Sequence, residues 1–85
     1  STPALLGLAR TQYALGDYPK AQVYYDEFQK HVSKQSAASL LLGIKLADQF
    51  GDKNTHASYA LALKNLYPKS REYLEYRAYM EQTRP

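Results

Sequence analysis

Apolar residues recur at intervals of three and four along most of the chain, which is the spacing of one face of an α-helix. Turn-forming residues interrupt this pattern at Gly16-Asp17, at the polar residues 33–36, at Gly51-Asp52 and at residues 68–70. No segment of four or more residues alternates between apolar and polar side chains, so we expect no strand. The pattern predicts an all-α protein with two antiparallel helix pairs and one closing helix.

Capping and breaking residues indicate where the five helices start. A proline is tolerated in the first turn, where its missing N–H has no partner to lose, and Ser, Thr and Asn side chains cap helix N-termini. The start signals in chain order are Thr2 before Pro3, Pro19, Ser36, Asn54 or Thr55, and Ser70. We expect the first helix to reach Leu15, the second to carry Val32 near its end and the third to cover residues 37–50.

The spacing of the apolar residues also predicts which side of each helix is buried. The residues expected to face inward are Ala21, Tyr24, Tyr25 and Phe28 in the second helix, and Leu40, Gly43, Ile44 and Ala47 in the third. Those of the fourth helix are Ala57, Ala60, Leu61, Leu63 and Tyr67, and those of the fifth are Tyr73, Tyr76 and Met80 with Leu74 and Ala78 beside them.

The two Gly-Asp turns are 35 residues apart, and small and large residues follow the first of them at Ala21 and Tyr25. A period near 34 residues with this turn resembles the tetratricopeptide repeat (TPR). The resemblance implies two helix-turn-helix repeats, residues 1–34 and 35–69, and a C-terminal capping helix, residues 70–82. Together they would form a fragment of a right-handed α-solenoid. The signature positions of the first repeat fall on Leu5, Leu8, Ala9, Gly16, Tyr18, Ala21 and Tyr25.

Several residues depart from the repeat pattern. Gln12 stands where an aromatic residue is usual, and Phe28 stands where a small residue is expected. In the second repeat Pro68 ends the second helix as in the family, but His56 falls on the small-residue position. We therefore expect the register to slip by one residue, so that Ala57 occupies that position.

Four strings, AQVYYDEF, SLLLGIKLA, ASYALALKNLYP and SREYLEY, give a narrower resemblance. In this order they resemble the C-terminal end of the type IV pilus biogenesis lipoproteins, the PilF/PilW group of pilotins. The resemblance implies a non-catalytic scaffold for fimbrial biogenesis and twitching motility, whose partner is the outer-membrane secretin. It also implies a periplasmic protein attached to the outer membrane through an N-terminal lipid anchor that is absent here, and a longer TPR array of which this chain is a piece.

The composition indicates the class of protein and excludes some kinds of site. The chain has 85 residues, 45% of them hydrophobic and 22% charged, a net charge of +3 and no cysteine. The composition is that of a globular protein, and the absence of cysteine excludes disulfides and thiolate metal sites. The longest apolar run near the middle, residues 40–44, is too short to span a bilayer.

Candidate catalytic groups are few. His31 and His56 have no second histidine or cysteine at ligand spacing, so we expect solvated side chains, no metal and no cofactor. Glu72 and Glu75 lie three residues apart near two arginines, which favours surface charge. Each glycine stands alone, so there is no glycine-rich phosphate loop. We do not expect an enzyme.

Nine tyrosines in a basic chain are compatible with stacking on nucleic acid bases. The basic residues are scattered over all the predicted helices without forming a stripe, which favours tyrosines that pack between helices. We therefore expect no nucleic-acid partner.

A peptide groove is the remaining candidate site. In TPR arrays the first helix of each repeat lines the concave face, and the positions that face it here are Leu6, Arg10, Tyr13, Leu41, Lys45 and Asp48. Arg10 and Lys45 are one period apart and would form a short basic ladder for a carboxylate or an acidic peptide. The alternatives are a merely solvated helix face, and a TPR regulatory or co-chaperone module for another peptide. If earlier repeats are missing, Leu5, Leu8 and Gln12 would be exposed, and the fragment would self-associate or melt at a lower temperature than the full array.

Overall fold

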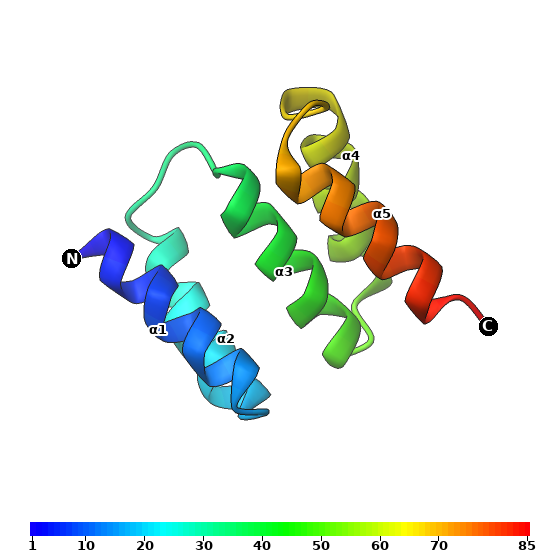
Figure 1. The fold of residues 1–85 in the computed structure, drawn as a ribbon. Coiled ribbons are helices and arrows are strands. Elements are labelled where there is room, and N and C mark those ends of the chain that lie inside the picture. Colours follow the sequence, from blue (N-terminus) through cyan, green and yellow to red (C-terminus); the bar gives the residue numbers. More distant parts are fainter.

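The computed structural model describes residues 1–85 as five α-helices and no strand, which confirms the predicted all-α fold (Figure 1). The helices are α1 (Thr2–Ala14), α2 (Tyr18–Gln29), α3 (Ala37–Gln49), α4 (Lys53–Leu66) and α5 (Arg71–Thr83). None of them combines the length and the apolar character that a bilayer-spanning helix needs.

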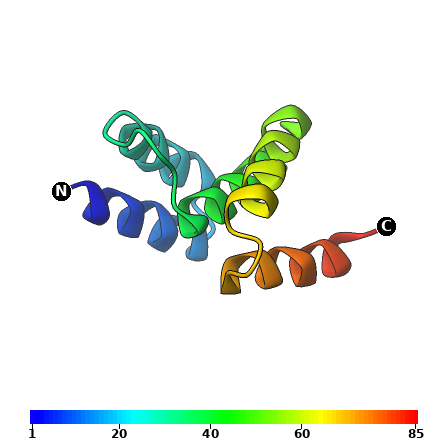
Figure 2. The ribbon, with the colours of Figure 1, turned by 90° about the horizontal axis from the view of Figure 1, so that it is seen from above.

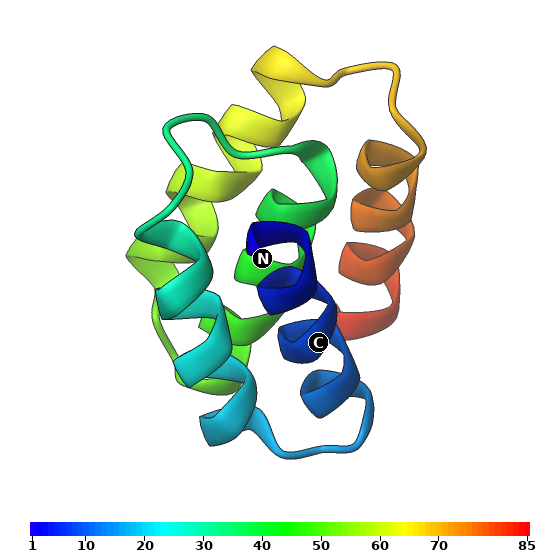
Figure 3. The same cartoon turned by 90° about the vertical axis from the view of Figure 1, so that its left-hand side faces the viewer.

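The helices are arranged around α3. The first pair, α1 and α2, and the second pair, α3 and α4, each pack side by side in antiparallel orientation, and α5 packs mainly on α3. Seen from above, α2 and α4 spread apart on one side of α3, whereas α1 and α5 lie on the other side (Figure 2). Figure 3 shows the same division, with α2 and α4 together and α5 opposite them. The first helix of each pair and α5 therefore share one face of the protein.

A glycine follows the first helix of each pair, in the turn that leads to the second helix. Gly16 and Gly51 have positive φ angles of 84° and 69°, which only glycine adopts without steric cost. Each is followed by an aspartate that caps the next helix: Asp17 accepts from the Lys20 N–H and Asp52 from the Thr55 N–H, both at 3.1 Å. The Gly-Asp pair thus stops one helix and starts the next within two residues.

The predicted caps need two corrections. Ser1, and not Thr2, caps α1, since its side chain accepts from the Ala4 N–H. Asp52, and not Asn54 or Thr55, caps α4. Thr55 is instead the partner of the cap, because its hydroxyl and its N–H both donate to Asp52 and so hold the pKa of that carboxyl below its ordinary value.

The end of α2 also differs from the prediction. The helix stops at Gln29, with Lys30 as its C-cap, so Val32 lies in the following loop. The predicted N-caps Ser36 and Ser70 are confirmed: their side chains accept from the Ser39 and Tyr73 N–H groups at 3.1 and 3.0 Å.

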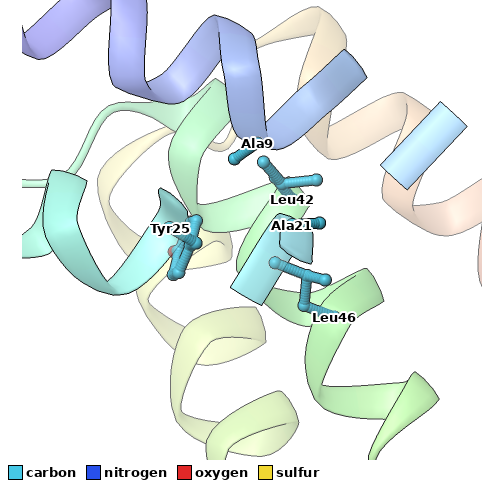
Figure 4. Close-up of a cluster of buried hydrophobic side chains, with 5 residues drawn as sticks. All are labelled: Ala9, Ala21, Tyr25, Leu42 and Leu46. Carbon is cyan, nitrogen blue, oxygen red and sulfur yellow. The ribbon is translucent and has the colours of Figure 1, made fainter. Parts of the chain in front are cut away.

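The core consists of two clusters on opposite sides of α3. Leu42 and Leu46 pack with Ala9, Ala21 and Tyr25 of the first pair (Figure 4). Leu40, Ile44 and Leu63 form the second cluster, and tyrosines of α4 and α5 pack around it. Because helices surround α3 on several sides, its buried residues include the four predicted ones, Leu40, Gly43, Ile44 and Ala47. The buried side of α2 is confirmed for Ala21, Tyr25 and Phe28, and Tyr24 is half-buried.

The predicted inward faces of α4 and α5 are partly wrong. Leu63 is fully buried and Ala60 half-buried, but Ala57 is exposed and Leu61 is 60% exposed. In α5 Tyr73 and Tyr76 pack on the second cluster as predicted, together with Tyr79, while Leu74 and Ala78 are exposed and Met80 is half-buried outside that cluster. Aliphatic and aromatic side chains of α4 both pack on the second cluster, so three of the five residues predicted for α4, Ala60, Leu63 and Tyr67, do lie inward.

Replacing Ala21 with leucine should lower the free energy of unfolding by about 1–3 kcal/mol, because added methylenes in a close-packed core force neighbouring side chains to move. Ala21 is 0% exposed and belongs to the first core cluster. Ala57→Leu is the matched control on exposed surface and should change stability by less than about 0.5 kcal/mol. Urea denaturation of both variants measures this. Equal midpoints would place Ala21 away from the helix crossing.

Candidate peptide-binding groove

A groove of about 250 Å³ lies between α1, α3 and α5. These are the helices that share one face of the protein in Figure 2. Leu41 and Leu42 of α3 are almost completely buried, and with Ala38 and Tyr13 they provide its apolar surface. Charged side chains from all three helices surround this surface. The residues that line the groove are Arg10, Tyr13, Ala38, Leu41, Leu42, Lys45, Arg71, Glu72 and Glu75.

Four of the six predicted site residues line this groove together: Arg10, Tyr13, Leu41 and Lys45. Leu6 does not line it, since its half-buried side chain packs against the first core cluster. Asp48 does not line it either, and its carboxylate is engaged in contacts with α4 and α5. Arg10 and Lys45, the basic ladder expected from the repeat spacing, therefore line one groove. Asp48, which was expected beside them, does not.

The two basic residues of the ladder lack acidic partners. Arg10 is exposed and Lys45 is half-buried, and neither belongs to any of the protein's ion pairs. The Lys45 Nζ instead lies 5.8 Å from the centroid of the Tyr79 ring, within the range of a cation–π contact. Their positive charges are thus available to an anionic group that enters the groove.

The α5 side of the groove was missed by the sequence reasoning. It carries Arg71, Glu72 and Glu75, which the sequence indicated only as surface charge. Arg71 Nε lies 3.6 Å from Glu75 Oε1 in an exposed pair one turn apart. The sequence does contain a pattern that predicts this side of the groove. Glu72 and Glu75 lie 34 residues, one TPR period, after Ala38 and Leu41, which line the groove from α3.

A polar network next to the groove joins α3, α4 and α5. His56 Nδ1 lies 2.5 Å from Asp48 Oδ1, and His56 Nε2 lies 3.2 Å from the Tyr76 hydroxyl. The Tyr79 hydroxyl donates to Asp48 Oδ2. One carboxylate on α3 therefore accepts from a histidine of α4 and a tyrosine of α5, which fixes the position of α5 beside the groove.

This network corrects two expectations about α4. The His56 side chain is only 15% exposed and is not solvated, whereas His31 is exposed as expected. The predicted slip of register is also wrong, because His56 points inward and Ala57 is exposed. A histidine replaces the small residue at this position because both ring nitrogens have partners on the neighbouring helices.

Burial raises the pKa of Tyr79 strongly, and the hydrogen bond to the Asp48 carboxylate raises it further. The pKa of Tyr76 is also raised, first by burial and then by the charge of Asp48. Both hydroxyls therefore stay protonated, and able to donate hydrogen bonds, to a higher pH than an ordinary tyrosine.

Replacing Asp48 with alanine should lower the free energy of unfolding by about 1–3 kcal/mol, because it leaves two partly buried donors without an acceptor. The control is Asp26→Ala on α2, where the exposed carboxylate accepts only from Gln22, and it should change stability by less than about 0.5 kcal/mol. Urea denaturation gives both values, and limited proteolysis should cleave α5 faster in the Asp48 variant. Equal stability and equal cleavage would show that the network does not hold α5.

Comparison with known proteins adds a family context. No protein-family model matches the chain. The chain is 49% identical over 73 residues to the type IV pilus assembly protein PilF of Pseudomonas aeruginosa, which is 86% of this chain and 29% of that protein. The solved structure of Pseudomonas aeruginosa PilF has a TM-score of 0.86 and 46% identity, covering 92% of this chain and 35% of that one.

A second solved structure, described as PilW, a widely conserved type IV pilus biogenesis factor, has a TM-score of 0.77 and 32% identity. It covers 87% of this chain and 34% of that chain. The chain thus spans about a third of the length of these relatives.

Proposed function

We propose that this chain, which is homologous to PilF and has the fold of PilF and PilW, acts in type IV pilus biogenesis as a non-catalytic TPR scaffold. The support is an identity of 49% over most of the chain, together with a shared helical arrangement. The relatives are pilus proteins and not co-chaperones, which favours this function over a TPR regulatory module with another peptide ligand.

The finer proposal is that the scaffold supports assembly of the outer-membrane secretin, and through it twitching motility. In the full-length protein this segment would be periplasmic and held at the outer membrane by a lipid anchor on a preceding part of the chain. The PilF/PilW resemblance carries both statements. An apolar groove surrounded by unpaired charges suits the binding of a peptide segment from such a partner.

The observation that carries the binding role is the meeting of Arg10 and Lys45 at one groove. They come from different repeats, share an apolar floor and have no acidic partner. A carboxylate that enters between them would form charge-assisted hydrogen bonds, which are stronger than neutral ones.

Reversing both basic charges, as Arg10→Glu with Lys45→Glu, should weaken binding to the secretin about tenfold or more, because complementary charges steer and hold the partner. Binding is measured by surface plasmon resonance with the purified secretin of the same organism. The loss should shrink as salt is raised, since exposed charges are screened over about 10 Å at 0.1 M ionic strength.

The matched control is Lys20→Glu with Lys53→Glu, which makes the same change in net charge outside the groove. Both lysines are exposed in the first turn of a helix, where an acidic residue is tolerated. Circular dichroism should be the same for the two double variants. Secretin binding that is equally strong in both would place the binding surface elsewhere in the protein.

A further inference from the structure

We infer that the groove between α1, α3 and α5 fits a peptide segment that carries an acidic and a basic side chain flanking an apolar one. This inference rests on the proposed function, because it names the ligand chemistry of the same groove. It differs from the expectation of a purely acidic ligand, which considered only the residues of α1 and α3.

The charges of the groove are divided between its walls. Arg10 and Lys45 come from α1 and α3, whereas α5 contributes one basic residue, Arg71, and two acidic ones, Glu72 and Glu75. Figure 2 shows α1 and α5 on the same side of α3, with the first half of α5 nearest to α3. The groove therefore presents a positive side and a side that contains two carboxylates.

No ion pair crosses the groove. Arg10, Lys45 and Glu72 belong to none of the five ion pairs of the protein, and Glu75 pairs only with Arg71 on its own helix. That pair is exposed, with 83% and 51% of the two side chains accessible, so it is weak. Basic and acidic side chains thus line the same apolar floor without forming ion pairs with each other across the groove.

This arrangement discriminates among ligands by charge. A uniformly acidic segment would be attracted by Arg10 and Lys45 but repelled by the α5 carboxylates, and a uniformly basic segment would meet the reverse. A segment with one charge of each sign is attracted at both walls. The floor of Leu41 and Leu42 lies between the walls, so an apolar residue between the two charges fits it.

The test uses fluorescently labelled ten-residue peptides with a central apolar residue, titrated against the 85-residue chain by anisotropy at low salt. Four compositions are compared: acid–apolar–base in both orders, acid–apolar–acid, base–apolar–base, and an uncharged peptide. We expect one of the mixed peptides to bind about two- to fivefold more tightly than the acidic one, the size of effect that single charges have at exposed interfaces.

Two variants test the α5 wall directly. Glu72→Gln removes the carboxylate without adding a charge, and Glu72→Lys should reverse the preference toward the acidic peptide. The control Glu81→Lys changes a carboxylate of the same helix outside the groove and should leave the preference unchanged. Circular dichroism confirms that α5 is intact in each variant.

The outcomes separate the two proposals. An acidic peptide that binds more tightly than both mixed peptides, with no effect of Glu72→Lys, would overturn the mixed-charge inference and leave the basic ladder as the binding site. A preference for the mixed peptide that is as strong in Glu72→Gln as in the unchanged protein would also overturn it. If no charged peptide binds better than the uncharged one, both the inference and the groove's proposed role fail.

Discussion

Replacing Tyr25 with alanine should lower the free energy of unfolding by about 3–5 kcal/mol, the cost of deleting a buried aromatic side chain. The Tyr25 ring is 2% exposed, packs in the first core cluster and lies with its centroid 6.1 Å from that of Phe28. A domain of this size has a total stability of roughly 4–13 kcal/mol. The variant should therefore unfold at a much lower urea concentration, with α1 and α2 detached from α3.

A second substitution separates the ring from its hydroxyl. The Tyr25 hydroxyl lies 2.8 Å from the Ser39 carbonyl oxygen and 2.9 Å from Gln35 Oε1, so it connects α2 to the start of α3. Tyr25→Phe should cost about 0.5–1.5 kcal/mol, the net value of a typical hydrogen bond. If Tyr25→Ala shifts the urea midpoint no more than Tyr25→Phe does, the ring does not contribute to the core.

The breaks between the helices could be predicted from the sequence because they depend on short-range chemistry. Gly16 and Gly51 supply the positive φ angles that end a helix, and the aspartates after them supply the caps. The small-then-large pair Ala21 and Tyr25 also marked a buried crossing correctly. Each of these features involves residues fewer than five positions apart.

The polar contacts of α4 and α5 could not be predicted in this way. The partner of His56 is Asp48, eight residues earlier and on another helix, and the partner of Tyr79 is again Asp48, 31 residues earlier. Apolar periodicity favoured Ala57 and Leu61, which are exposed, because they are more hydrophobic than a histidine. His56, Tyr76 and Tyr79 also pack inward, since each finds a hydrogen-bond partner on a neighbouring helix.

The α1 and α3 sides of the groove could be predicted from the sequence, but its α5 side was not. Repeat spacing brings Arg10 and Lys45 to equivalent positions, and this follows from the sequence alone. The contribution of α5 depends on treating the last helix as the first helix of a further repeat and not only as a cap. Glu72 and Glu75 then fall one period after Ala38 and Leu41, and the groove gains the wall that changes its charge.

Replacing Gly43 with alanine should lower the free energy of unfolding by about 2–4 kcal/mol, although alanine normally stabilises a helix interior by about 0.5–1 kcal/mol relative to glycine. A Cβ at Gly43 would lie 2.6 Å from Tyr59 Cε2 and 2.7 Å from Tyr59 Cδ2, and it would also overlap the Tyr25 hydroxyl. The Tyr25 side chain is buried and its hydroxyl is hydrogen-bonded to Ser39, so it has little room to move.

Gly7→Ala in α1 is the matched control, because a Cβ there would meet no atom within 4 Å. This substitution should stabilise the protein by about 0.5–1 kcal/mol through helix propensity alone. The same glycine-to-alanine change should thus move the urea midpoint in opposite directions at the two positions. The difference is that Tyr25 and Tyr59 pack against Gly43, whereas no side chain packs against Gly7. A Gly43→Ala variant that gains stability as Gly7→Ala does would mean that Tyr25 and Tyr59 are not closely packed over α3, and the contact between α2, α3 and α4 would have to be looser than described.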